Sequence, residues 1–208
     1  MPESRRRGPL FIQEVGPRDG LQMEALFLPT AQKIALIDAL SACGFAKIEV
    51  TSFTSPKAIP SLADADEVMR GIRREPGVVY TALVPNVRGA ERALATGTDE
   101  LNLVMSASET HNLLNLRMTR AQSVTRLLEV VDLSLAGGVP LNVSLSASFG
   151  CPMEGAVDPA AVLDLADRFL SRGVRGITLC DTTGMAHPDQ VADLSEAFQR
   201  RFPRAELT

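Results

Sequence analysis

Arg18 and Asp19 stand side by side between two glycines, within the stretch Glu14–Gln22 that reads EVGPRDGLQ. An aspartate carboxylate is a hard oxygen ligand for Mg²⁺ or Mn²⁺. An arginine guanidinium is a planar cationic fork that fits an enolate or carboxylate oxygen. Gly16 and Gly20 predict a tight turn around the pair. An Arg-Asp pair in a turn is also common as a solvated surface pair, so the elements around it must decide between the two interpretations.

Two further carboxylates lie where chemistry is possible. Glu49 stands among apolar neighbours in KIEVTSF, residues 47–53, and a buried carboxylate needs a partner. It is predicted to form an ion pair that orients Arg18, which serves both a structural and a functional interpretation. Asp181 follows the run Gly176–Thr182. It either caps the next turn or faces the reacting centre as a proton-transfer or orienting group.

The elements that must position these residues are short strands alternating with helices. Apolar, β-branched runs bounded by Gly, Pro, Asp or Ser predict strands at Leu10–Val15, Lys47–Phe53, Val78–Val84, Glu100–Ser106, Pro140–Ala147 and Gly176–Thr182. Segments with helical spacing lie between them, and Asp158-Pro159 is a favourable helix start. Several strands show little alternation and are expected to be buried on both faces. This order predicts an α/β protein with a parallel sheet.

Two architectures fit that order, an open doubly wound sheet and a (β/α)₈ TIM barrel. The first predicts a glycine-rich dinucleotide loop after strand one, and neither G-x-G-x-x-G nor a Walker A pattern is present. Polar residues instead follow many strands, among them Asn86, Ser106 and Ser146. Function drawn from the carboxyl ends of many strands is typical of the barrel, which we therefore favour.

The strand spacing leaves the expected barrel incomplete. Strands are predicted to begin near residues 10, 47, 78, 100, 140 and 176, and a seventh near 205. A barrel needs about 250 residues for eight units. We therefore expect six β/α units plus the start of strand seven, in a longer natural protein. The predicted organisation is a basic tail over residues 1–8 and a partial TIM-barrel catalytic domain over residues 9–208.

Composition excludes several function classes. The net charge is −4, from 21 Lys+Arg and 25 Asp+Glu, which gives no reason to expect a nucleic-acid or membrane partner. No apolar run has the length of about 20 residues that a membrane helix needs. Three widely spaced cysteines and no signal-peptide pattern predict reduced thiols and a cytoplasmic location.

The motifs together resemble the hydroxymethylglutaryl-CoA lyase family along essentially the whole chain. The residues that carry the resemblance are Glu14–Gln22, Ile48–Phe53 with Ser55-Pro56-Lys57, Val84-Pro85-Asn86, Gly150–Gly155 (GCPMEG) and Asp181–Gly184 (DTTG). Related synthases that condense acetyl-CoA with keto acids also carry Arg-Asp-Gly, usually with an acidic residue where Leu21 stands. Ser55-Pro56-Lys57 and Gly150-Cys151-Pro152 favour the lyase.

The resemblance implies a metal-dependent TIM-barrel enzyme of leucine degradation. It would cleave 3-hydroxy-3-methylglutaryl-CoA to acetoacetate and acetyl-CoA by a retro-Claisen reaction. Asp19 matches a ligand of a divalent metal, Mg²⁺ or Mn²⁺, and Arg18, Glu49 and Asp181 match catalytic positions. The expected substrate-binding residues are Arg18, Gln22, Asn86 and Ser146. The expected partners are an acyl-CoA substrate and, at full length, a second copy in a homodimer.

The sequence also departs from the family pattern. The family's His-x-His pair, a further Asn ligand and a glycine-rich loop with a catalytic cysteine have no counterpart here, so most metal ligands are missing. His111 is predicted to lie in a loop and His187 at a helix start, each as a surface or capping residue, and Cys151 in a tight turn. The alternatives are a sister lyase or synthase acting on another branched hydroxyacyl-CoA, and an inactive fragment that binds a partner.

Overall fold

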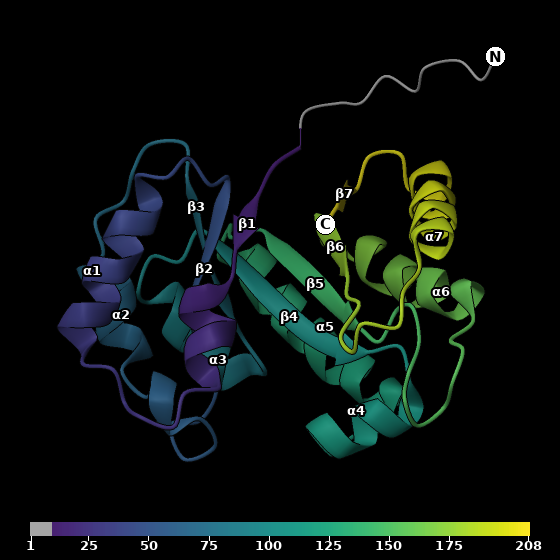
Figure 1. The fold of residues 1–208 in the computed structure, drawn as a ribbon, viewed down its shortest axis with the longest axis horizontal. Helices are drawn as coiled ribbons and strands as arrows, with labels where there is room; N and C mark the ends of the chain where they lie inside the picture. Colours follow the sequence, from purple (N-terminus) through teal and green to yellow (C-terminus); the bar gives the residue numbers. More distant parts are fainter. Residues whose placement is uncertain (1–9) are drawn as a thin grey trace.

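The computed structural model describes residues 10–208, so the predicted basic tail lies outside the described residues. Figure 1 shows the strands side by side across the centre of the molecule, with the helices around the outside. The strands are β1 (Gln13–Glu14), β2 (Lys47–Ser52), β3 (Val79–Leu83), β4 (Glu100–Ser106), β5 (Leu141–Ser146), β6 (Gly176–Leu179) and β7 (Glu206–Leu207). The helices are α1 (Thr30–Ser41), α2 (Ala65–Gly71), α3 (Val87–Leu94), α4 (Glu109–Leu116), α5 (Arg120–Ala136), α6 (Pro159–Leu170) and α7 (Pro188–Arg201).

All seven strands belong to one parallel sheet, and their order in the sheet is their order in the sequence, from β1 to β7. A doubly wound sheet would reverse its strand order at a switch point. The strictly sequential order is that of a TIM barrel and confirms the predicted fold class. Within residues 10–208, β1 and β7 each pair on one side only.

Local sequence signals account for the helix boundaries that frame the site. Asp158 caps α6 by accepting a hydrogen bond from the Ala160 amide, and Pro159 occupies the first helical position, as predicted. Thr119 and Gln122 form a reciprocal capping box at the start of α5. These caps satisfy amide groups that the helices themselves leave unpaired.

The strands alternate more clearly than the sequence predicts. In β4, Leu101, Leu103 and Met105 are buried in the core that the helices cover, whereas Asn102 faces the opposite side of the sheet. Leu141, Val143 and Leu145 of β5 share that core with them. β4 and β5 are buried along nearly their whole length, which confirms the expected burial on both faces, but only one of the two faces is apolar. Their second face carries polar side chains that bond to one another, which offsets the cost of burying them.

The first strand is shorter than predicted. Only Gln13 and Glu14 of the run Leu10–Val15 are paired with β2. Leu10, Phe11 and Ile12 are exposed at 95%, 78% and 66%. β1 lies at the edge of the sheet, so β2 is its only neighbour among the described strands. The length of β1 therefore depends on β2 alone, which pairs with two of its residues.

Candidate functional site

A cavity of about 780 Å³ lies at the carboxyl ends of the strands. Arg18, Asp19, Gln22, Ser146 and Asp181, all predicted as site residues, are among the residues that line it. We call it the strand-end cavity. Parallel strands bring their carboxyl ends to one edge of a sheet, and TIM-barrel active sites form at that edge. The sequence positions from 18 to 181 are thus gathered into one space by the fold.

The segment after β1 differs in detail from the predicted tight turn. Gly16–Gly20 forms a single π-helical turn, which the Leu21 amide closes by donating to the Gly16 carbonyl. Just before it, the Val15 carbonyl accepts hydrogen bonds from the Arg18 amide at 3.0 Å and the Asp19 amide at 2.7 Å. Short π-helical turns occur often at functional sites. The turn gives the two side chains different environments, since the side chain of Arg18 is 14% exposed and that of Asp19 is 62% exposed.

Arg18 is held by two carboxylates. Its Nε donates to Oε2 of Glu49 at 2.6 Å, and its Nη1 donates to Oδ1 of Asp19 at 2.7 Å. Glu49 is completely buried, at 0% exposure. The predicted pairing of Glu49 with Arg18 is thus present, and a planar guanidinium held on one edge keeps a fixed orientation. Arg18 presents a fixed positive charge to the cavity.

Behind Glu49 lies a set of hydrogen bonds that the sequence interpretation missed. Asn102 of β4 donates to Oε1 of Glu49 at 2.7 Å. Asn142 and Ser144 of β5 both donate to Oδ1 of Asn102, at 3.0 and 2.9 Å. The available signal was a polar residue at every second position of β5, with Asn102 at the matching position of β4. The Thr178 hydroxyl accepts a further hydrogen bond from Asn142. We use the name amide network for the set Glu49, Asn102, Asn142, Ser144 and Thr178.

Asp181 stabilises a turn and also lies at the strand-end cavity. Its Oδ1 accepts hydrogen bonds from the amides of Met185 and Ala186, at 2.9 and 3.2 Å, so it stabilises the turn after β6. Asp181 also lines the strand-end cavity. Beside it, burial raises the pKa of the Cys180 thiol to about 11, with a further increase from the Glu49 charge. Cys180 is therefore a neutral thiol in the cavity.

Two residues occupy places that the sequence did not predict. Asn86 is exposed, caps α3 by accepting from the Gly89 amide at 3.0 Å, and is not among the residues lining the cavity. The position after β3 is also the position before α3, and the cap determines where its side chain points. His111 lies inside α4, not in a loop, and it lines the cavity. His187 caps α7 through its Nδ1, as predicted.

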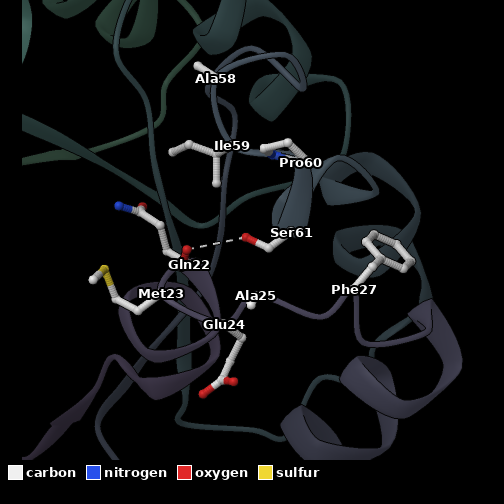
Figure 2. Close-up of a pocket in the computed structure, with 9 residues that line it drawn as sticks. All are labelled: Gln22, Met23, Glu24, Ala25, Phe27, Ala58, Ile59, Pro60 and Ser61. Atoms are coloured by element: carbon white, nitrogen blue, oxygen red, sulfur yellow. Dashed lines mark hydrogen bonds between the residues drawn. The ribbon is translucent and has the colours of Figure 1, made fainter.

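A smaller hollow of about 400 Å³ adjoins the strand-end cavity and shares Gln22, Ala58 and Ile59 with it. Figure 2 shows the hollow between the segment that follows the π-helical turn and the segment around Ser61. The Ser61 hydroxyl donates to the Gln22 carbonyl at 3.4 Å, which links the two segments. The amide group of Gln22 lies on the side away from Phe27 (Figure 2). Gln22 is the predicted site residue that borders both spaces.

The described residues do not complete a metal site. Among residues 10–208, no group of three His, Cys, Asp or Glu side chains is placed to hold a metal ion. Asp19 offers an exposed carboxylate, but its Oδ1 already accepts from Arg18. Mg²⁺ and Mn²⁺ prefer several oxygen ligands, and one of the two carboxylate oxygens of Asp19 is already bonded to a guanidinium. Asp19 alone therefore gives no basis for deriving a metal-dependent step.

Comparisons with known proteins agree with this geometry. A family profile described as HMGL-like matches residues 10–208. A hydroxymethylglutaryl-CoA lyase of Bacillus subtilis is 44% identical over 196 residues, which are 94% of this chain and 66% of the relative. The mitochondrial enzyme of Homo sapiens is 38% identical over 94% of this chain and 60% of its own length. The chain thus spans slightly less than two thirds of these relatives.

Solved structures give the same result. An HMG-CoA lyase from Acenitobacter baumannii, in complex with coenzyme A and 3-methylmalate, has a TM-score of 0.89 and 46% identity. That match covers 95% of this chain and 65% of the other. The Bacillus subtilis HMG-CoA lyase structure has a TM-score of 0.90 and 44% identity, over 95% of this chain and 67% of the other. Given the profile match and these relatives, the chain belongs to the HMGL-like family.

Proposed function

We propose that the natural protein carrying this sequence is a carbon-carbon lyase that cleaves 3-hydroxy-3-methylglutaryl-CoA to acetoacetate and acetyl-CoA. The observation that carries the proposal is the guanidinium of Arg18, held by the buried Glu49 at 2.6 Å in a cavity that Asp181 also lines. A retro-Claisen cleavage needs such a fixed positive charge where an enolate forms. The lyase names of the relatives support the same assignment.

The proposed reaction follows from the electron flow of a retro-Claisen cleavage. A base removes the proton of the C3 hydroxyl, and the oxygen electrons form the new ketone of acetoacetate. The C2–C3 bond breaks, and its electron pair moves into the thioester to give the enolate of acetyl-CoA. That enolate then takes a proton at carbon. Negative charge thus leaves the C3 oxygen and collects on the thioester oxygen, where an electrostatic partner is most effective.

Arg18 is proposed as that partner. The hydrogen bonds to Glu49 and Asp19 use its Nε hydrogen and one Nη1 hydrogen, so hydrogens on both Nη atoms remain for a substrate oxygen. The Glu49 carboxylate fixes the guanidinium plane, so no reorientation is needed as charge develops. Lysine in the same place would be a point charge without this planar fork.

Asp181 is proposed to act at the C3 hydroxyl. Its Oδ1 is taken by two backbone amides, which fixes the carboxylate plane and leaves Oδ2 for the substrate. Gln22 and Ser146, which also line the cavity, are proposed as hydrogen-bonding residues for the acyl-CoA. Asn86 is not carried into this proposal because its side chain caps α3.

Several finer features belong to the same proposal. Asp19 is the one residue of this chain that we propose as a ligand for Mg²⁺ or Mn²⁺, and no step above depends on it.

No helix in the described part of the chain is long and apolar enough to cross a membrane. We propose a cytoplasmic homodimer that takes part in leucine degradation, with a cytoplasmic location supported by the free thiols of Cys43, Cys151 and Cys180.

The test is a product assay on the natural protein. We expect it to convert 3-hydroxy-3-methylglutaryl-CoA into acetyl-CoA and acetoacetate in equal amounts, measured by liquid chromatography and mass spectrometry with the Bacillus subtilis enzyme as positive control. Other branched 3-hydroxyacyl-CoA esters are assayed in parallel. Absence of both products under conditions in which the control is active would overturn the proposal. A higher kcat/KM for another ester would reassign the substrate.

A further inference from the structure

Glu49 can orient Arg18 only if Glu49 itself cannot turn. The Glu49 side chain is 1% exposed, and its two carboxylate oxygens have different partners, with Oε2 facing Arg18 and Oε1 facing Asn102. Asn102 lies on β4, two strands away from β2, so it approaches the carboxylate from the side opposite the Arg18 turn. We propose that Asn102 is a positioning residue, which acts on the substrate only through Glu49 and Arg18. This inference rests on the proposed function for its effect on turnover.

The orientation of the Asn102 amide is determined by its partners. Its Oδ1 accepts from Nδ2 of Asn142 and from Oγ of Ser144, so its Nδ2 is the group that faces Glu49. A flipped amide would set its oxygen against the carboxylate and its NH₂ against the NH₂ of Asn142. Both contacts would be repulsive, so the surroundings permit one orientation. Asn142 is fixed in turn by its second hydrogen bond, to Oγ1 of Thr178 at 2.9 Å.

Within the amide network, one continuous line of hydrogen bonds points toward the carboxylate. Asn142 donates to Asn102, and Asn102 donates to Glu49, as Arg18 does from the other side. Aligned donors polarise one another and stabilise a negative charge at the end of the chain. Asn102, Asn142 and Ser144 are 4%, 5% and 7% exposed, so little water competes with these bonds. The network therefore does more than fill the space between strands, because it holds the buried Glu49 carboxylate in one orientation.

Removal of the Asn102 donor should release Glu49 and, through it, Arg18. In Asn102→Leu the volume is nearly kept, but Oε1 of Glu49 loses its partner. We expect kcat for the proposed substrate to fall about 10- to 100-fold, because a misplacement near 1 Å can cost about 100-fold in rate. KM should change less than about threefold, since the charge that develops in the transition state depends on Arg18 more than ground-state binding does.

The readout that separates positioning from general stability is the Arg18 Nε–H signal. It is observed by NMR of the natural protein labelled with ¹⁵N-arginine, and it is identified as the signal that Arg18→Lys removes. In Asn102→Leu we expect this signal to shift and its proton to exchange faster with water. Asn142→Leu, which removes one of the two donors that hold Oδ1 of Asn102, should show the same change to a smaller extent. Asn142→Leu is the variant to measure if Asn102→Leu does not fold.

Ser134→Ala is the matched control. Ser134 is at 0% exposure and donates to the Val139 carbonyl at 2.9 Å in α5, outside the amide network. Its loss should lower the melting temperature and leave kcat and the Arg18 signal unchanged. An unchanged Arg18 signal in a folded Asn102→Leu or Asn142→Leu variant would overturn the inference, whatever the effect on kcat. If the unmodified protein cleaves no acyl-CoA, the proposed function fails, and the Arg18 signal alone still decides whether Asn102 positions Arg18.

Discussion

Cys180 shows how strongly individual groups in the strand-end cavity respond to their surroundings. Burial raises its pKa to about 11, the Ser144 hydrogen bond opposes that increase, and the Glu49 charge adds to it. The thiolate is disfavoured because a second negative charge beside Glu49 would be poorly solvated. Because the pKa in the folded state lies above the ordinary 9.0, this thiol contributes stability below pH 9 that is lost as the pH rises toward 11.

We predict that alkylation by iodoacetamide distinguishes Cys180 from Cys43. At pH 8 about one Cys180 in a thousand is a thiolate, the reactive form. Its labelling rate should rise about tenfold per pH unit from pH 7 to pH 10. Cys43 is exposed and should react first. Peptide-resolved mass spectrometry measures both rates, and equal labelling of the two residues at pH 8 would contradict the assignment of a raised pKa.

At this scale, sequence alone predicted the charged residues better than the neutral ones. Arg18 and Glu49 were predicted as a pair, because a buried carboxylate needs a partner. Asn102 was missed because an amide inside a strand carries no such requirement. Asn86 was misplaced because the end of a strand and the start of a helix coincide there, and the cap decided its orientation. Assigning a role to neutral polar residues requires knowledge of which strands are neighbours.

Among the elements, the loop after β5 is important because it fixes α4. Cys151 and Gly155 exchange backbone hydrogen bonds of 2.8 and 2.7 Å, which confirms the predicted tight turn. The turn aims Glu154 at the start of α4, where its Oε1 accepts from the Thr110 amide at 2.6 Å. A carboxylate at a helix N-terminus is stabilising. Since α4 carries His111 into the cavity, this contact links the loop to the site.

We predict that Glu154→Gln weakens this contact. Hydrogen bonds from the side chain and backbone of Thr110 lower the pKa of Glu154 below its ordinary 4.5, against the opposing effect of burial. A lowered pKa means that the stabilisation is present above pH 4.5 and is lost as the pH falls below it. At pH 7 the variant should lose about 0.3–0.5 kcal/mol in the free energy of unfolding, because Glu154 is exposed and solvent screens its charge.

The measurement is urea denaturation of both proteins from pH 7 to pH 3. The difference between them should narrow below pH 4.5, whereas Glu91→Gln, on the exposed side of α3, should show no comparable loss. A difference that is constant over this range would show that the charge of Glu154 does not stabilise α4. Hydrogen exchange at the α4 amides localises the effect to that helix.

Element types were readily predicted from sequence, and element lengths were not. The strand Glu100–Ser106 is observed with the predicted bounds, because β3 pairs with its first three residues and β5 pairs with it from Leu101 to Ser106. The run Leu10–Val15 has an equally strong strand pattern, yet only Gln13 and Glu14 are paired. Pairing depends on a neighbour, and local propensity contains no information about whether one is present.

For the molecule as a whole, the sequential order of seven parallel strands leaves edges at β1 and β7 within the described residues. Leu10, Phe11 and Ile12 continue the first edge as an exposed apolar run. Unpaired strand edges with apolar side chains are sites of association with other chains. The whole-molecule property that follows is a tendency to self-associate through this edge.

We predict that the 208-residue polypeptide self-associates in solution. Size exclusion with multi-angle light scattering should give a mass above that of one chain, increasing with concentration. Phe11→Lys places a charge on the exposed edge and should shift the distribution toward the monomer. Lys57→Arg, which keeps an exposed positive charge elsewhere, is the control and should behave as the unmodified chain. A monodisperse monomer with a cooperative melt would contradict the prediction.

The sheet, the π-helical turn and the amide network together place the Arg18 guanidinium at the strand-end cavity. The central claim is that this guanidinium stabilises an enolate. The most direct test compares Arg18→Lys with the unmodified natural protein in the cleavage of 3-hydroxy-3-methylglutaryl-CoA. We predict a fall in kcat of about 10²–10³, little change in the melting temperature, and normal turnover in Arg88→Lys, an exposed control on α3. Near-normal kcat in Arg18→Lys would contradict the account.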